Sequence, residues 1–184
     1  MNATSKNDVV QLLLDQHAEI RKLFTQVENA SGETRREKFD ELRALLAVHE
    51  TAEEEVVHPF SRGVLGKTSA EVDAIIGEEE QAKHVLKRLE KVGTGSPEFL
   101  PLFRELHDAV EKHARHEERE EFPRLRERAE PDELAGLATM VRAAEAVAPT
   151  HPHPGTDSAT KNLIAGPMAA VADRARDAIR KARH

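Results

Sequence analysis

The chain has 184 residues, a length that fits one globular domain with a short appendage. Charged residues make up 33% of it, and its formal net charge is −7. It contains no Cys and no Tyr, which excludes disulfides, thiolate metal ligands, cysteine nucleophiles and a tyrosyl radical. No apolar run has the length of a membrane span, and the N-terminus lacks the apolar centre of a secretory signal. We therefore expect a cytoplasmic protein that does not contact membranes.

Apolar residues at helical spacing predict four long amphipathic helices, over residues 7–30, 34–59, 70–92 and 98–122. The connections between them are short and contain Gly, Ser and Pro. Short connections favour antiparallel neighbours, so the sequence predicts an all-α fold in which residues 1–125 form an antiparallel up-down-up-down four-helix bundle.

Beyond the bundle, residues 126–148 are expected to form an additional fifth helix packed on it, with Pro131 in the first turn. Residues 149–184 are expected to form a proline-containing linker and a basic C-terminal helix. Residues 161–184 carry six Lys and Arg against two Asp, whereas the rest of the chain is acidic. We therefore expect this C-terminal helical extension to dock on the bundle or to form a homodimer contact, and we expect no nucleic acid partner.

The second and fourth helices share a motif, HETAEEEVVHPF from His49 and HARHEEREEFPR from His113. Each copy has a His, a Glu four residues later and a Pro ten residues later, and the flanking apolar positions also coincide. A residue four positions on lies about 40° round the helix. Glu53 and Glu117 should therefore point into the bundle together with the two histidines.

The first helix places His17 within a stripe of apolar residues, and the same apolar offsets in the third helix centre on Glu79. His84 lies about 140° from Glu79 on the helical wheel and has charged neighbours, so we expect it on the solvent side. Glu80 and His84 remain alternatives to Glu79. The predicted metal ligands are His17, His49, Glu53, Glu79, His113 and Glu117.

Burying these groups without compensation would cost many kcal/mol, and a metal ion is the natural compensation. Three imidazoles and three carboxylates suit two ions such as iron or manganese better than copper, while zinc commonly takes about four ligands at one ion. Glu53 and Glu117, on opposing helices, would bridge the two ions.

The remaining His and Glu residues of the two motifs are assigned to other roles. His58, nine residues after His49, lies about 180° round the helix and is expected to face solvent. His116 and Glu120 lie on the side of His113 and are candidates for proton handling, with a rim salt bridge as the alternative. A solvated acidic face is expected from Glu54, Glu55, Glu118 and Glu121.

The arrangement His17, then His49-x-x-x-Glu53, then His113-x-x-x-Glu117 resembles the hemerythrin-like family with the HHE cation-binding domain, over about residues 7–125. The resemblance implies two iron ions in a non-haem di-iron centre that meets O2, hydrogen peroxide or nitric oxide. Members usually supply a His from the third helix, where this chain has GEEEQAKH. A Glu ligand there would stabilise the oxidised state and favour redox turnover or sensing over reversible O2 carriage.

We therefore expect a di-iron protein that reacts with O2 or peroxide, with catalase-like turnover as its enzymatic form, in an oxidative stress response. Iron is favoured over manganese. One alternative is a non-enzymatic sensor or binder of iron, O2 or nitric oxide. The other is a metal-free helical interaction protein in which the His and Glu residues are structural. The sequence contains no phosphate-binding loop motif, no dinucleotide-binding fingerprint and no motif of a Ser-His-Asp catalytic triad.

Overall fold

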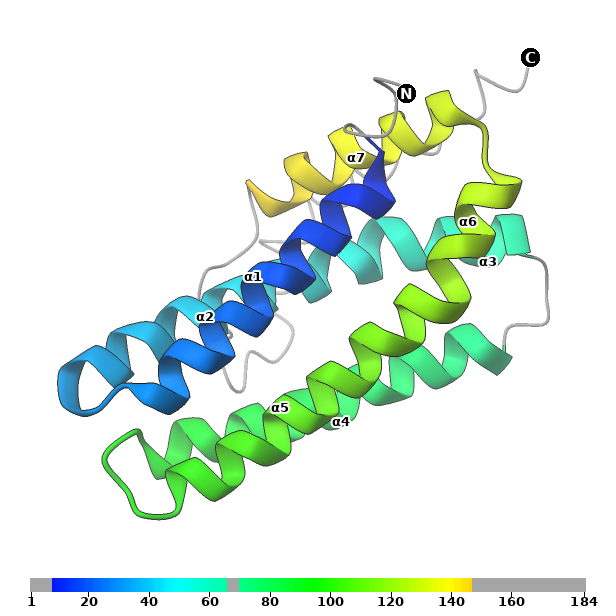
Figure 1. The fold of residues 1–184 in the computed structure, drawn as a ribbon. Helices are drawn as coiled ribbons and strands as arrows, with labels where there is room; N and C mark the ends of the chain where they lie inside the picture. Colours follow the sequence, from blue (N-terminus) through cyan, green and yellow to red (C-terminus); the bar gives the residue numbers. More distant parts are fainter. Residues whose placement is uncertain (1–7, 66–69, 147–184) are drawn as a thin grey trace, which may run out of the picture.

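The computed structural model describes residues 8–65 and 70–146, apart from the side chains of residues 70–77 and 79–81. It is all-α, as the sequence predicts, and the predicted antiparallel bundle is confirmed (Figure 1). The linker and the basic C-terminal helix expected over residues 149–184, with their dimer contact, lie outside the described residues. No helix in the described ranges is long and apolar enough to cross a membrane.

The first hairpin consists of α1 (Val9–Asn29) and α2 (Gly32–Ala52). The side chain of Asp8 caps α1 by accepting a 2.7 Å hydrogen bond from the backbone N–H of Gln11. Gly32 has a φ of 55°, a conformation that glycine adopts without the steric cost of a side chain, and this allows the tight turn into α2. The turn places α1 and α2 side by side and antiparallel.

The second hairpin consists of α4 (Ala70–Val92) and α5 (Phe99–His116), and its connection lies at the same end of the molecule as the turn between α1 and α2 (Figure 1). The fifth helix, α7 (Pro131–Glu145), packs against α1 and α2. Pro131 occupies its first turn as predicted, and Glu130 and Glu133 form a capping box there.

The helices that carry the repeated motif are longer than predicted, and neither is a regular α-helix. α2 continues through a π-helix, η2 (Glu53–Val57), into α3 (His58–Leu65). α5 continues in the same way through η3 (Glu117–Glu121) into α6 (Phe122–Arg128). In each case a backbone N–H reaches five residues back, from His58 to Glu53 and from Phe122 to Glu117.

The motif's proline explains both π-helices. A proline inside a helix lacks the N–H that would bond four residues back, and its ring clashes with that carbonyl. For Pro59 and Pro123 the clashing carbonyls belong to Glu55 and Arg119, which lie within η2 and η3. The wider π turn removes the clash and inserts one extra residue into each helix.

The hydrophobic core is divided into two clusters. The loop-end cluster lies near the two hairpin connections and contains four of the buried phenylalanines: Phe24, Phe39, Phe99 and Phe103. The α7-end cluster packs the start of α1 and the segments after the π-helices against α7, and contains Val9, Leu13, Val56, Phe122 and Leu137. Along α1, α2 and α5 the residues between the two clusters include His17, His49 and His113. A polar layer therefore crosses the middle of the bundle.

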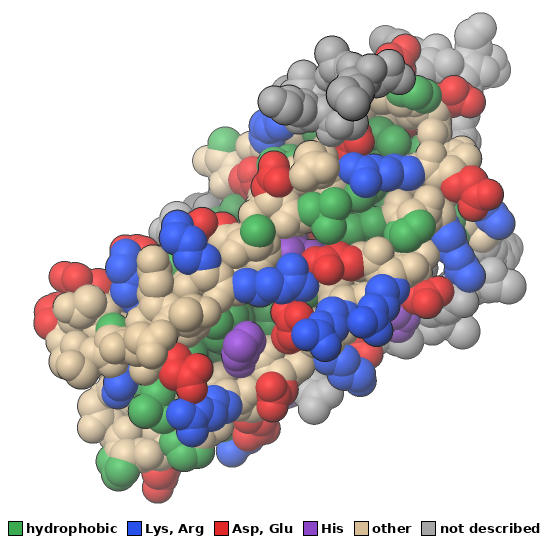
Figure 2. All heavy atoms as spheres, in the orientation of Figure 1, with side chains coloured by type: hydrophobic (Ala, Val, Ile, Leu, Met, Phe, Trp, Pro, Cys, Tyr) green, Lys and Arg blue, Asp and Glu red, His purple; other side chains and the backbone are tan. Residues whose placement is uncertain are grey.

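The surface differs from this interior in carrying charges of both signs. On the face shown in Figure 2, groups of Lys and Arg side chains lie next to groups of Asp and Glu side chains.

Candidate metal centre

Three buried histidines from three helices meet in the polar layer. Their Nε2 atoms face two buried carboxylates: His17 lies 3.3 Å from Glu117 Oε2, His49 lies 3.3 Å from Glu53 Oε1, and His113 lies 3.4 Å from Glu117 Oε2. Two atoms bound to one ion at about 2.1 Å in tetrahedral geometry are roughly 3.4 Å apart. The spacing therefore suits atoms that share an ion.

The carboxylate of Glu117 is fully buried, and neither of its oxygens makes a hydrogen bond within the described residues. Burial, and then the nearby charge of Glu53, raises the pKa of Glu117 to about 7. Ligand atoms of His17, His49, Glu53 and Glu117 all lie within 4.8 Å of one another. A cation bound among them would compensate the buried negative charge.

The outer nitrogens of two of these rings are held by hydrogen bonds. His17 Nδ1 lies 2.9 Å from Oε1 of Glu118, and Arg21 Nη1 donates to the same oxygen at 2.9 Å. Glu118 was predicted to be part of a solvated face, but it is half-buried because it bridges this ring and Arg21. Such outer partners commonly fix the tautomer and orientation of metal-ligating histidines.

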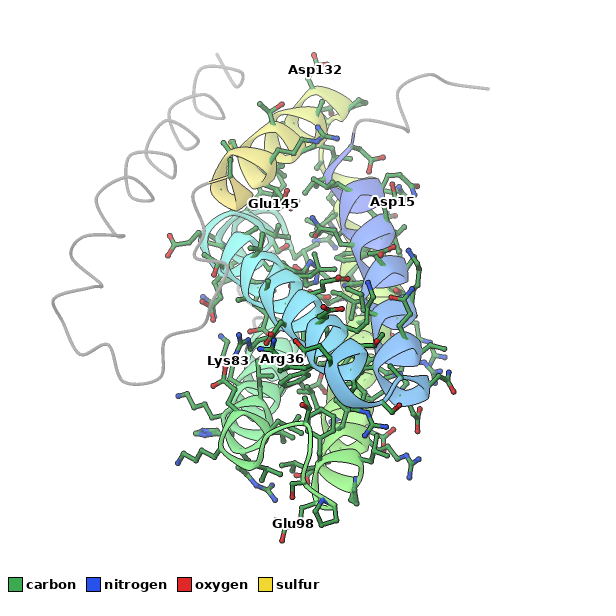
Figure 3. The ribbon with its side chains drawn as sticks, turned by 90° about the vertical axis from the view of Figure 1, so that its left-hand side faces the viewer. Asp15, Arg36, Lys83, Glu98, Asp132 and Glu145 are labelled. Atoms are coloured by element: carbon green, nitrogen blue, oxygen red, sulfur yellow. The ribbon has the colours of Figure 1, made fainter. Side chains whose placement is uncertain are left out.

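His49 has a neutral partner in the same role. Its Nδ1 donates a 2.7 Å hydrogen bond to the side-chain oxygen of Gln16, and Gln16 Nε2 donates to Glu145 at the end of α7 (labelled in Figure 3). Burial, followed by the proximity of His17 and His113, lowers the pKa of His49 well below its ordinary value. His49 is therefore a neutral imidazole, which is the form that binds a metal ion.

His58 and Glu121 are both buried, with exposed fractions of 1% and 3%, so the prediction that they face solvent is wrong. The π-helices are the cause. One inserted residue brings His58 from about 180° to about 80° from His49, and Glu121 to about 20° from His113. The proline ten residues after each motif histidine is the sequence feature that could have revealed this shift.

His58 and Glu121 lie beside the first group of ligands. His58 Nδ1 is 3.8 Å from Glu121 Oε1, and ligand atoms of His58, Glu117 and Glu121 lie within 4.8 Å of one another. Burial raises the pKa of Glu121, but the adjacent His58 ring and Ser61 hydroxyl outweigh it, so the pKa is lowered overall. Glu117 thus belongs to two groups of candidate ligands.

The other predicted site residues lie outside these two groups. His116 is partly exposed, and its Nδ1 lies 3.2 Å from Glu78 Oε2, the kind of rim pair that was the alternative to proton handling. Glu120 and His84 are exposed. The side chains of Glu79 and Glu80 lie outside the described residues, so a ligand from the third bundle helix remains a prediction, as does a proton-handling role for His116 and Glu120.

A small cavity of about 20 Å³ adjoins His17, His49 and His113. Its wall includes the apolar side chains of Ile20, Phe24, Leu46, Ala82 and Val110, and also Arg21, Glu50, His107 and Glu111. A cavity of about 10–15 Å³ on this measure is enough for one water molecule. The space therefore suits water or a molecule of two heavy atoms, and no larger one.

Fold and site together define a helical-bundle protein with a buried candidate cation site. The sequence model of the Hemerythrin HHE cation binding domain matches residues 8–125, and the chain belongs to this family.

An uncharacterized hemerythrin-like protein of Schizosaccharomyces pombe is 31% identical over 140 residues, which are 74% of this chain and 68% of that protein. A protein of Nostoc sp. named DNA nickase is 27% identical over 139 residues, but the match spans 75% of this chain and only 38% of the Nostoc protein.

The same fold is found in the crystal structure of a hemerythrin HHE cation binding domain-containing protein from Mycobacterium kansasii. Its TM-score is 0.68 and its identity 22%, and the match covers 76% of this chain and 85% of that one.

Proposed function

We propose that this chain is a non-haem di-iron protein that reacts with O2 or hydrogen peroxide, with catalase-like turnover, in a cytoplasmic oxidative stress response. The observation that carries the proposal is the buried layer of His and Glu side chains beside a cavity of about 20 Å³. Bound iron would supply a Lewis acid that polarises the oxidant and exchanges electrons with it.

The side chains of the polar layer would hold the ions in a fixed geometry. His17, His49 and His113 present Nε2 toward the carboxylates of Glu53 and Glu117. These residues offer nitrogen and oxygen donors without sulfur, a set that suits iron or manganese. Iron is favoured because the family resemblance implies it.

The cavity supports a small oxidant over an organic substrate. Its volume of about 20 Å³ suits O2, hydrogen peroxide or nitric oxide better than an organic molecule of ordinary size. The substrate's own size would therefore be the main source of specificity.

The test is to load the purified full chain with Fe(II) under anaerobic conditions and then admit air or peroxide. The proposal expects about two irons per chain, an oxo-bridge absorption band after exposure to air, and peroxide consumption with one O2 released per two peroxides. His49→Ala and Glu117→Ala should lose both metal and turnover, while Glu120→Ala, which changes an exposed residue, should keep the metal. A wild-type chain that is helical, stable and unable to bind metal would contradict the proposal.

A second candidate is a non-enzymatic sensor of iron, O2 or nitric oxide. The observation that favours it is the hydrogen-bond chain from His49 through Gln16 to Glu145, which joins the polar layer to the last turn of α7. A diferric spectrum that does not change with peroxide would support sensing. Metal-dependent cleavage by protease within residues 147–184, lost in Gln16→Ala, would support it further.

A further inference from the structure

The second candidate ligand group draws on both copies of the motif in an unequal way. When His49 is aligned with His113, His58 falls on Phe122 and Val57 falls on Glu121. One copy thus supplies a His and the other a Glu at neighbouring positions. Their apolar counterparts lie in the α7-end cluster, where Phe122 stacks on the His17 ring at a centroid distance of 5.7 Å. If the two motif copies were equivalent, both would carry apolar residues at these two positions.

The oxygen atoms of Glu117, Glu121 and the nearby Ser61 are buried without hydrogen bonds of normal geometry. Neither carboxylate oxygen of Glu121 or Glu117, and not the hydroxyl of Ser61, makes a hydrogen bond within the described residues. Ser61 is fully buried, and its hydroxyl lies close enough to Glu121 to lower the pKa of that carboxyl. Buried polar atoms are normally paired, and the ordinary exceptions include an ion or a water that would fill the space.

The distances fit a shared ion. One ligand atom from each of His58, Glu117 and Glu121 lies within 4.8 Å of the other two. Two atoms bound to one ion at about 2.1 Å lie roughly 3.0–4.2 Å apart, depending on the angle between them. The His58 to Glu121 separation of 3.8 Å falls within this range.

We propose that His58 and Glu121, together with the shared carboxylate of Glu117, bind the second cation of the pair. The hydroxyl of Ser61 would orient Glu121. This inference rests on the proposed function, because it assigns ligands to the second of its two irons. In this assignment the second ion takes a histidine and a carboxylate from the segments at and after the π-helices. It does not need a ligand from α4.

The charge of the layer is compatible with two cations. Glu53, Glu117 and Glu121 contribute three buried negative charges. With all three carboxylates ionised, one divalent ion would leave a net charge of −1 in the interior, whereas two would leave +1, which one hydroxide ion from water would neutralise.

The test measures how many irons the full chain binds. Metal-free protein is titrated with Fe(II) anaerobically, and iron per chain is counted after desalting and after challenge with a chelator. Glu121→Gln keeps the size of the side chain, and His58→Phe introduces the residue that the other motif copy carries at this position. Glu120→Gln is the matched control, since its side chain is exposed and precedes Glu121.

The wild type and Glu120→Gln should bind two irons. Glu121→Gln and His58→Phe should retain one and hold the second at least roughly tenfold more weakly. After oxidation these two variants should show the electron paramagnetic resonance signal of an isolated high-spin ferric ion, which a coupled pair lacks. Glu117→Gln should weaken both sites.

Two irons bound with wild-type affinity in both variants would overturn this assignment while leaving the proposed function intact. Loss of both irons from either variant, with helical content unchanged by circular dichroism, would also overturn it. A wild type that binds no iron would instead remove the proposed function.

Discussion

Nδ1 of His17 lies 2.9 Å from the carboxylate of Glu118, which Arg21 clamps from the other side at 2.9 Å. The carboxylate fixes the ring so that Nε2 points at Glu117, 3.3 Å away. Glu118 contacts the first ligand group at His17, so its effect on a bound ion would pass through that ring.

Replacing Glu118 should therefore weaken metal binding without abolishing it. Glu118→Gln keeps a hydrogen-bond acceptor but removes the charge, and we expect affinity for Fe(II) to fall about 10–100-fold. Competition with a chelator of known affinity measures the change. Glu120→Gln serves as the control, and equal affinities in the two variants would show that Glu118 does not act through His17.

The raised pKa of Glu117 predicts how the metal-free protein responds to pH. Burial, and then Glu53, raises this pKa from 4.5 to about 7, so between these values the folded chain holds a proton that the unfolded chain releases. The folded state binds more protons in this window, and stability must fall as pH rises through it. The shift corresponds to about 3 kcal/mol.

Urea unfolding of the metal-free wild type and of Glu117→Gln at pH 5 and pH 8 checks this. The wild type should lose more stability between the two pH values than the variant, by about 3 kcal/mol. A saturating divalent ion should restore wild-type stability at pH 8. Parallel pH profiles would mean that Glu117 does not titrate in this window.

Filling the cavity should separate oxidant access from metal binding. Val110 lines the cavity, and Val110→Ile adds one methylene to a space of about 20 Å³. We expect unchanged iron content and slower reaction with peroxide, with a stability cost of about 1–3 kcal/mol from overpacking. Val85→Ile makes the same change in the loop-end cluster away from the cavity wall. Equal rates in the two variants would show that the cavity is not the route of the oxidant.

The third bundle helix offers a test of helix register. Glu79→Ala should reduce bound iron, since the apolar pattern places this residue toward the core, whereas His84→Ala should leave it unchanged because His84 is exposed. Measuring the iron bound per chain in the two variants shows which of the two residues is a ligand. The reverse result would mean that α4 is rotated relative to the predicted register.

The regular part of this fold could be predicted from the sequence. The spacing of apolar residues placed the starts of the four bundle helices to within two residues, and it identified His17, His49 and His113 as core-facing because each lies on an apolar stripe. Glu53 and Glu117 followed from the four-residue spacing, which is still regular where the π-helices begin.

The positions of His58 and Glu121 could not be obtained in that way. A helical wheel assumes 3.6 residues per turn throughout, and a single inserted residue rotates everything after it by about 100°. Glu118 was missed for a different reason. Its burial depends on Arg21, which belongs to another helix and approaches it only after the bundle has formed.

The polar layer also separates two apolar regions that would otherwise be one continuous core. Without an ion, the chain has two well-packed ends joined across a band of mutually repelling carboxylates, where local opening costs least. Backbone amides in this band should exchange with solvent faster in the metal-free chain, and proteases should cut there first. If the layer binds a metal ion, the lifetime of the protein in the cell would then depend on the supply of that ion.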